Sequence, residues 1–255
     1  MPPAAHPATA DPRPLVPAVV RAAAVLDALA RERQPMSMAR LAERLALPRS
    51  SVHGLCSTLH SLGLLRRQAD GAFAIGPRVM HLAEAFLAGT DVAREFDALW
   101  HSRQQQPEET VLLSVLDGSE VVYLAAHNGT RPLGLAFSRG MRLPAHLAAT
   151  GRAMLAFAGD EQVRRICGAG PLRRVTSRGP ADARALLREL QPFKATGCSV
   201  DDEGIRLGVY CLASPVFDAA GRVVAGVGVC LSKPMCTEAE VARQRAQVID
   251  TARAL

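Results

Sequence analysis

The segment from residue 48 to residue 62 places small polar side chains at helical spacing. The polar positions recur every three or four residues: Ser50, His53, Gly54, Ser57 and Ser61. Hydroxyl and imidazole groups both donate and accept hydrogen bonds, and small side chains let a helix approach another surface closely. A solvated helix face is more often filled with Lys and Glu. The pattern therefore predicts a helix that reads base edges in the DNA major groove, with the adjacent Arg49 near a phosphate.

The opposite face of the same segment is apolar. Its positions follow the i, i+3, i+4, i+7 spacing of a helix packed on a core: Val52, Leu55, Cys56, Leu59 and Leu62. The preceding residues repeat the pattern with Met38, Leu41, Ala42 and Leu45. Two short helices joined by a tight turn predict a helix-turn-helix. An ordinary helical hairpin is the alternative that this segment alone leaves open.

The residues that follow favour the DNA-binding interpretation. Asp70-Gly71 lies between two short runs that can pair, so we expect a β-hairpin, or wing. A helix from Val16 to Ala30 would complete a three-helix core. Residues 15–76 thus predict a winged helix-turn-helix domain. This span has eight Arg, no Lys and four acidic residues, so it carries a formal net charge of +4, out of +6 for the whole chain. The candidate DNA-binding residues are Arg49, Ser50, Ser51, His53, Ser57, Arg66 and Arg67, with the arginines on phosphates.

Length and composition predict two domains. A chain of 255 residues can hold one small DNA-binding module and one domain of ordinary size. Residues 1–14 contain five Pro and four Ala, and we expect a disordered arm there. Residues 77–103 show two helical stripes, with Phe96 and Trp100 among the apolar positions, and predict a helical linker in which these side chains serve packing. Residues 104–255 then form the second domain.

The chain shows neither a membrane nor a secretion signal. No apolar run approaches the roughly 18 residues needed to span a bilayer, and the first residues lack a basic start followed by an apolar stretch. We therefore expect a cytoplasmic protein without membrane association. The six cysteines form no Cys-x-x-Cys pair, so we expect free thiols, no structural metal and no cofactor.

The second domain predicts an antiparallel sheet with helices. Asp117-Gly118 joins apolar runs over residues 111–116 and 120–126, which indicates a hairpin. Residues 133–137 predict a third strand, and residues 208–217 and 222–231 two more. Residues 139–146 are expected to be a loop, followed by helices at about 149–158, 160–167 and 181–195 and a last helix from about Thr237. Strands joined by hairpins with helices grouped apart give an α+β fold.

Several of these runs, in this order, resemble the IclR family of transcriptional regulators. The similar runs are residues 121–126, 140–157, 197–203, 208–218 and 221–229, together with Pro48-Arg-Ser-Ser-Val52 and Phe73-Ala-Ile-Gly76. The resemblance implies an N-terminal winged helix-turn-helix, a linker helix and a C-terminal GAF-like domain with an antiparallel sheet. It also implies a double-stranded DNA operator, a small-molecule effector such as an organic acid, and assembly as a homodimer or tetramer.

The resemblance also places the effector site. Asp201 and Cys211 match the family's acidic and thiol positions, and Leu147, Ala148 and Ala149 match a loop that lines the pocket wall. Gly228 and Cys230 stand where some relatives have serines that bind a small carboxylate. The loss of two hydroxyls favours a larger or less polar effector.

Two other functions compete with a ligand-responsive regulator. An enzyme could be imagined from Cys211, His146 and Asp201, but their spacing does not show that they meet, and no glycine-rich phosphate loop or nucleophile elbow is present. We therefore expect no enzymatic activity and no catalytic residues. A metal- or redox-sensing regulator is the stronger alternative, because Cys198, Cys211, Cys230 and His146 come from segments that could converge.

Overall fold

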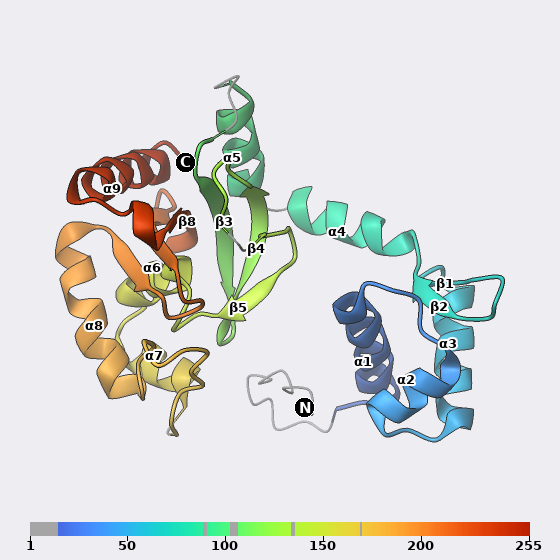
Figure 1. Cartoon of the computed structure of the whole chain (residues 1–255). Helices are drawn as coiled ribbons and strands as arrows, with labels where there is room; N and C mark the ends of the chain where they lie inside the picture. The colour runs from blue at the N-terminus through green and yellow to red at the C-terminus, as the bar shows by residue number, and fades with distance from the viewer. Residues whose placement is uncertain (1–14, 89–90, 103–106, 134–135, 169) are drawn as a thin grey trace. The chain divides into compact units, whose positions relative to one another are not determined.

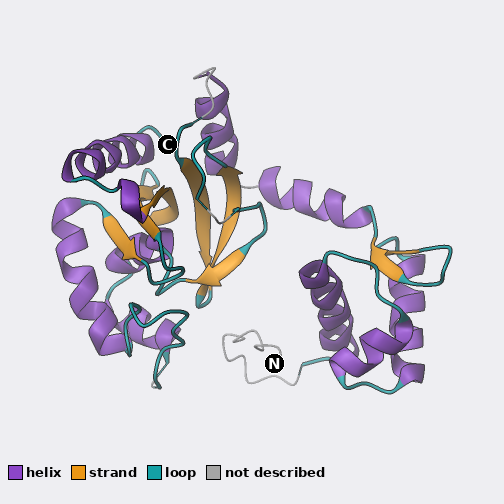
Figure 2. Cartoon of the chain, viewed as in Figure 1, coloured by secondary structure: helices purple, strands orange, loops and turns teal. Residues whose placement is uncertain are grey.

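The computed structural model describes residues 15–88, 91–102, 107–133, 136–168 and 170–255. These residues belong to two compact units that meet in sequence at Gly89 and Thr90 (Figure 1). Residues 1–14, which we expect to be a disordered arm, lie outside the described residues. Helices dominate the N-terminal unit, whereas the C-terminal unit combines a sheet with helices (Figure 2).

The N-terminal unit has the predicted three helices followed by a hairpin. Its elements are α1 (Pro17–Glu32), α2 (Met38–Leu45), α3 (Arg49–Ser61), β1 (Leu65–Arg67), β2 (Phe73–Ile75) and α4 (Arg78–Ala88). Val25, Leu29, Leu41, Val52 and Cys56 are buried together at the centre of the three helices. Most of the apolar stripe positions therefore lie in the core that their spacing predicts. Leu62 does not: it is 45% exposed, because α3 ends at Ser61 and Leu62 is its C-cap.

Two backbone features keep the turn between α2 and α3 short. Ala46 ends α2 in the left-handed region with φ of 51°, and Pro48 immediately precedes α3. Ser37 begins α2 by accepting a hydrogen bond from the N–H of Arg40 at 3.3 Å. A tight turn of this kind holds α3 against α2 in a fixed direction.

The C-terminal unit contains one six-stranded antiparallel sheet. Its elements are α5 (Asp91–Ser102), β3 (Thr110–Asp117), β4 (Glu120–His127), β5 (Arg142–Pro144), α6 (Ala149–Phe157), α7 (Asp160–Cys167), α8 (Ala183–Thr196), β6 (Ser199–Asp202), β7 (Val209–Phe217), β8 (Val223–Ser232), the short 3-10 helix η1 (Lys233–Met235) and α9 (Glu238–Arg253). The strand order is β5-β4-β3-β8-β7-β6. The α+β class expected from the sequence is confirmed.

Helices cover the central strands of the sheet. Helix α6 packs on β3, β6, β7 and β8, and α8 packs on α6 as an outer layer. Helix α9 packs on β7 and β8, and α5 packs on β4 (Figure 1). Strands β7 and β8 are buried along most of their length rather than at alternate residues, as expected for strands that are covered on both faces.

The sheet differs from the sequence expectation at both edges. The strand expected over residues 133–137 is absent at the described residues 133, 136 and 137, and 134–135 lie outside the described residues. The side chain of Asn128 instead bonds both the N–H of Phe137, at 3.2 Å, and its carbonyl oxygen, at 3.1 Å. The edge beside β4 is taken by β5, from the segment expected to be a loop, and β6 forms the other edge.

The two helices expected in the linker belong to different units. Helix α4 is part of the N-terminal unit, and α5 is part of the C-terminal unit. The rings of Phe96 and Trp100 on α5 stack with His127 of β4, at centroid distances of 5.6 and 5.9 Å. This contact confirms the packing role expected for these two side chains.

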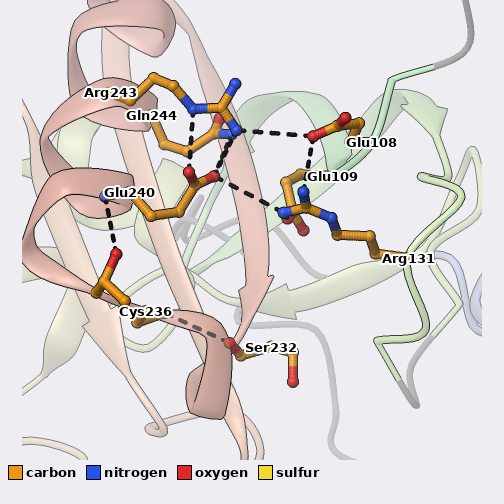
Figure 3. Close-up of polar contacts among 9 residues, drawn as sticks. Glu108, Glu109, Arg131, Ser232, Cys236, Glu240, Arg243 and Gln244 are labelled. Atoms are coloured by element: carbon orange, nitrogen blue, oxygen red, sulfur yellow. Dashed lines mark hydrogen bonds and ion pairs between the residues drawn. The ribbon is translucent and has the colours of Figure 1, made fainter.

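An ion-pair network fastens the start of α9 to the sheet. Arg131 donates to Glu109 at 2.6 Å and to Glu108 at 2.9 Å, and Arg243 donates to Glu240 at 2.7 Å (Figure 3). Glu240 also lies 3.9 Å from Arg131, which joins the two pairs. Networks of several charges hold elements together better than isolated surface pairs.

Gly151 allows α6 to lie directly on the backbone of Ala145. A Cβ atom at Gly151 would lie 2.3 Å from the carbonyl oxygen of Ala145. We predict that Gly151→Ala lowers the free energy of unfolding by about 2 kcal/mol or more, since the clash outweighs the gain of about 1 kcal/mol in helix propensity. Urea denaturation followed by circular dichroism measures the change.

Gly54→Ala provides the matched control. It is the same substitution in another helix, but a Cβ atom at Gly54 has no neighbour within 4 Å. It should leave stability unchanged or raise it by up to about 1 kcal/mol. Equal effects of the two substitutions would contradict the close packing of α6.

Candidate functional site

The outer face of α3 holds the predicted base-reading side chains. Arg49, Ser50, His53 and Ser57 are exposed on this helix, whereas Ser51 is half-buried. None of the five side chains makes a hydrogen bond or ion pair within the described part of the chain. The hydroxyl of Ser61, by contrast, donates to the carbonyl of Thr58 at 2.8 Å and is satisfied within the helix. The free polar groups therefore gather in the first nine residues of α3.

The two wing arginines have different surroundings. Successive residues of a strand point to opposite faces, so Arg66 and Arg67 of β1 diverge. The guanidinium of Arg67 lies over the ring of Phe73, 6.0 Å from its centroid, whereas Arg66 is exposed and pairs in register with Ala74. Arg66 is thus the freer of the two to meet a phosphate.

The C-terminal unit encloses a cavity between the sheet and the start of α6. Its empty space is about 320 Å³, which includes the part open to solvent, and the cavity is narrow. The residues that line it are Leu112, Tyr123, Phe137, Leu143, Ala148, Ala149, Thr150, Asp201, Ile205, Val209, Cys211, Leu212, Gly228 and Cys230. None of these is a lysine, arginine or histidine.

Six of the seven candidate effector residues line this cavity. They are Ala148, Ala149, Asp201, Cys211, Gly228 and Cys230. The seventh, Leu147, is buried elsewhere, with its Cδ2 atom beside Gly179 and Gly204. Sequence reasoning missed the aromatic wall of Tyr123 and Phe137, whose rings meet edge to face at 5.4 Å. Phe137 comes from the region where we expected a strand, so its direction could not be inferred.

Three of the lining residues form a row across neighbouring strands. Asp201 of β6 pairs in register with Cys211 of β7, which pairs with Cys230 of β8. Side chains at directly paired positions point to the same face of a sheet. The register therefore places a carboxyl group and two thiols side by side on the cavity floor.

Asp201 is the only acid among the lining residues and has few partners. It is 2% exposed, and its Oδ1 atom accepts a hydrogen bond from the N–H of Gly204 at 2.7 Å. Burial raises the pKa of Asp201 to about 6, although the Gly204 bond and the charge of Arg152 act in the opposite direction. Near neutral pH this group can therefore exchange a proton with its surroundings.

The start of α6 lines one end of the cavity through Ala148, Ala149 and Thr150. No side chain caps this helix, and the N–H groups of Ala149, Thr150 and Gly151 donate no hydrogen bond within the described residues. Helix N-termini bind anions through such free N–H groups and the positive end of the helix dipole. This end of the cavity is therefore suited to a carboxylate.

The structure does not bring His146 together with the cavity thiols as a nucleophile and base. Burial lowers the pKa of His146, and its Nε2 atom lies 2.9 Å from the carbonyl oxygen of Arg173 rather than near a thiol. His146 is not among the lining residues. Within the described ranges, no group of three or more His, Cys, Asp or Glu side chains is placed to hold a metal ion.

Two family profiles match the chain. The profile described as bacterial transcriptional regulator IclR C-terminal matches residues 84–255, and the IclR helix-turn-helix domain matches residues 18–69. The chain belongs to the IclR family. It is therefore related to transcriptional regulators with an N-terminal helix-turn-helix and a C-terminal effector domain.

Individual IclR relatives cover nearly the whole chain. The Pca regulon regulatory protein of Pseudomonas putida is 28% identical over 235 residues, which are 91% of this chain and 80% of that protein. The repressor BlcR of Agobacterium tumefaciens is 34% identical with a TM-score of 0.58, covering 93% of this chain and 94% of that one. An IclR homologue of Microbacterium hydrocarbonoxydans, solved with 4-hydroxybenzoate, is 27% identical with a TM-score of 0.76, covering 92% and 98%.

Asp201 should make stability depend on pH. Its folded-state pKa of about 6 lies above the ordinary value of 3.8, so between these values the folded state holds a proton that the unfolded state has released. Stability should fall as pH rises through this window, by up to about 3 kcal/mol. We predict that Asp201→Asn, which mimics the protonated acid, removes this component of the pH dependence. Urea unfolding at several pH values between 4 and 7 measures it.

The control for charge is the neighbouring Asp202→Asn. Asp202 is exposed and paired with Lys233 outside the cavity. This variant should keep the decline in stability between pH 4 and pH 6. The same decline in Asp201→Asn would show that the acid is not the source.

Proposed function

We propose that this IclR-family protein controls transcription by binding an operator in double-stranded DNA, with an affinity that changes when a small organic acid occupies the cavity beneath α6. The observation that supports the effector most directly is the uncapped start of α6 at the cavity wall, where three N–H groups lack partners. A ligand that prefers one conformation of the protein changes operator affinity by a coupling free energy of about 1–3 kcal/mol.

The DNA surface that we propose consists of Arg49, Ser50, Ser51, His53, Ser57, Arg66 and Arg67. Its support is the exposed and unpaired polar face of α3 beside the basic hairpin. A cytoplasmic location follows from this function. No helix in the described part of the chain is long and apolar enough to cross a bilayer.

The chemistry of the cavity favours an acid with an apolar body. A carboxylate would accept from the N–H groups of α6, and the remainder would lie against Leu112, Tyr123 and Phe137. The relative solved with 4-hydroxybenzoate is consistent with such a ligand. Leu147 does not line the cavity, so its proposed role is to support the wall.

We further propose that the chain assembles as a homodimer or tetramer through its N-terminal unit. Leu15, Val16, Val19 and Val20 are exposed together at the start of α1. An exposed apolar face of this kind is typical of an interaction surface. A second copy would also supply the second recognition helix that a palindromic operator needs.

Phosphate and base contacts can be separated by salt titration. We predict that Arg49→Ala and Arg66→Ala each weaken binding to operator and random DNA alike and reduce the salt slope by roughly one unit. His53→Ala should instead cost about 1–3 kcal/mol on the operator and little on random DNA. Fluorescence anisotropy over a range of salt concentrations measures both effects.

The control for these variants is Arg164→Ala on α7, which removes the same charge from the C-terminal unit. It should leave the slope unchanged. Unchanged salt slopes for both Arg49→Ala and Arg66→Ala would exclude these two arginines from the phosphate contacts. An equal loss of affinity for operator and random DNA in His53→Ala would exclude His53 from base reading.

The effector site can be tested with a panel of carboxylates, phenolic acids and lactones that includes 4-hydroxybenzoate. A ligand at 100 times its Kd stabilises the folded state by about 2.7 kcal/mol and so raises Tm. We predict that Cys211→Leu abolishes this shift and the ligand's effect on operator binding, because Leu adds bulk at the cavity floor. Operator binding without ligand should persist, since α3 lies in the other unit. A full ligand response in Cys211→Leu would move the effector site away from β7.

A further inference from the structure

Two thiols meet on the floor of the cavity. The Sγ atoms of Cys211 and Cys230 lie 2.8 Å apart, with the Cys211 thiol donating, and both side chains are buried. Each of the other four cysteines lies on a different part of the chain: Cys56 on α3, Cys167 at the end of α7, Cys198 before β6 and Cys236 after η1. Cys211 and Cys230 alone among the described cysteines occupy paired positions on neighbouring strands.

The backbone register makes this pair suitable for a covalent bridge. The N–H of Lys233 donates to the carbonyl of Gly208 at 2.8 Å across β7 and β8, whereas the N–H of Glu203 donates to the carbonyl of Val209 at 3.0 Å. The backbone N–H and C=O groups of successive residues in β7 point alternately toward β8 and toward β6. Those of Val209 and Cys211 therefore point toward β6. Cys211 and Cys230 are therefore a non-hydrogen-bonded pair, the closer of the two antiparallel types. Its typical Cα separation of about 4.5 Å lies within the range of disulfides.

We propose that Cys211 and Cys230 form a reversible disulfide on exposure to small hydroperoxides, and that this disulfide weakens effector binding in the cavity. The second half of this proposal rests on the proposed function, in which the same cavity is the effector site. The disulfide itself does not depend on that assignment.

The reaction is a two-electron oxidation in two steps. The sulfur of Cys211, the more exposed of the two at 7% against 2%, attacks one oxygen of the hydroperoxide. An S–O bond forms, the O–O bond breaks, the alcohol leaves with one proton, and Cys211 becomes a sulfenic acid. The sulfur of Cys230 then attacks that of Cys211, an S–S bond forms, the S–O bond breaks, and water carries away the second thiol proton. Two thiols and one hydroperoxide thus give one disulfide, one alcohol and one water.

The environment of the pair makes the first step slow. The hydrogen bond to Cys230 and burial both raise the pKa of the Cys211 thiol, so little of it is present as the reactive thiolate. The pair would respond to sustained oxidant rather than to a brief pulse. An occupied cavity should also shield the thiols, because the ligand would lie between them and solvent.

A disulfide would affect the cavity directly. The cavity is narrow, so a ligand can enter only if lining side chains move apart. A covalent bond between two floor residues prevents their separation and joins β7 to β8. We therefore expect oxidation to weaken effector binding about tenfold or more.

The first experiment measures the disulfide itself. The reduced full-length protein is treated with tert-butyl hydroperoxide, excess oxidant is removed, and the product is analysed by intact mass and by peptide mapping. We expect a loss of about 2 Da, a peptide that links Cys211 to Cys230, and a Tm raised by about 5–10 °C that returns to its original value with dithiothreitol. Cys230→Ser should show neither the linked peptide nor the rise in Tm. If the serine hydroxyl disturbs folding, Cys230→Ala replaces this variant, with the same result expected.

The matched control is Cys198→Ser, which removes a buried thiol that has no thiol partner. It should retain both the link and the Tm rise. A different linked pair, a stable sulfenic or sulfinic acid at Cys211, or an unchanged mass after prolonged oxidant would overturn the proposal.

The second experiment compares oxidised and reduced protein with an acid that shifts Tm in the panel. Binding about tenfold weaker after oxidation, and slower oxidation in the presence of that acid, would support control of the cavity. Equal affinity of the two forms would overturn it. If no acid in the panel binds, the effector assignment fails, whereas the mass and peptide results still decide whether the disulfide forms.

Discussion

The close seating of α6 on the sheet is the constraint on which the C-terminal unit depends. Gly151 lies against the backbone of Ala145, and a Cβ atom at Gly226 would lie 2.8 Å from the carbonyl oxygen of Thr150. The hydroxyl of Ser114 on β3 donates to that of Thr150 at 2.7 Å and fixes the helix at this distance. The cavity lies at the helix start, so this approach sets its shape.

The same packing gives a physical reason for the glycine at position 228. A Cβ atom there would lie 2.8 Å from the methyl group of Thr150. The glycine therefore makes room for Thr150. In the proposed effector site, the backbone N–H groups at the start of α6 would donate to a carboxylate, and the rings of Tyr123 and Phe137 would supply apolar contact.

The cavity combines groups whose protonation depends on burial. Asp201, Cys211 and Cys230 lie in one cross-strand row, and burial disfavours the charged forms of Asp201 and Cys211. An anionic ligand at the helix start would meet less repulsion from a protonated acid than from a carboxylate. In this row the charge of a bound ligand, the protonation of Asp201 and the reactions of the two thiols would therefore influence one another.

The sequence by itself determined the elements whose pattern is local. Helical periodicity predicts the two faces of α3, whereas the hairpin that follows it and the long strands of the sheet are predicted by apolar runs bounded by turn residues such as Asp-Gly. The family resemblance added the cavity floor, including Asp201, Cys211 and Cys230. Leu147 does not line the cavity, because its side chain lies beside Gly179 and Gly204, whereas Ala148 and Ala149 line it.

Only the tertiary structure decided the sheet edges, the aromatic wall and the contact between the two thiols. Strand β5 has three residues, too few for a periodic signal, and Phe137 is positioned by hydrogen bonds that it exchanges with the side chain of Asn128. The Cys211–Cys230 contact requires the register of two strands, and β-pairing register depends on the whole sheet rather than on either segment. Contacts between strands leave no local pattern, so the sequence could name the two cysteines but could not bring them together, and it could not name the aromatic wall.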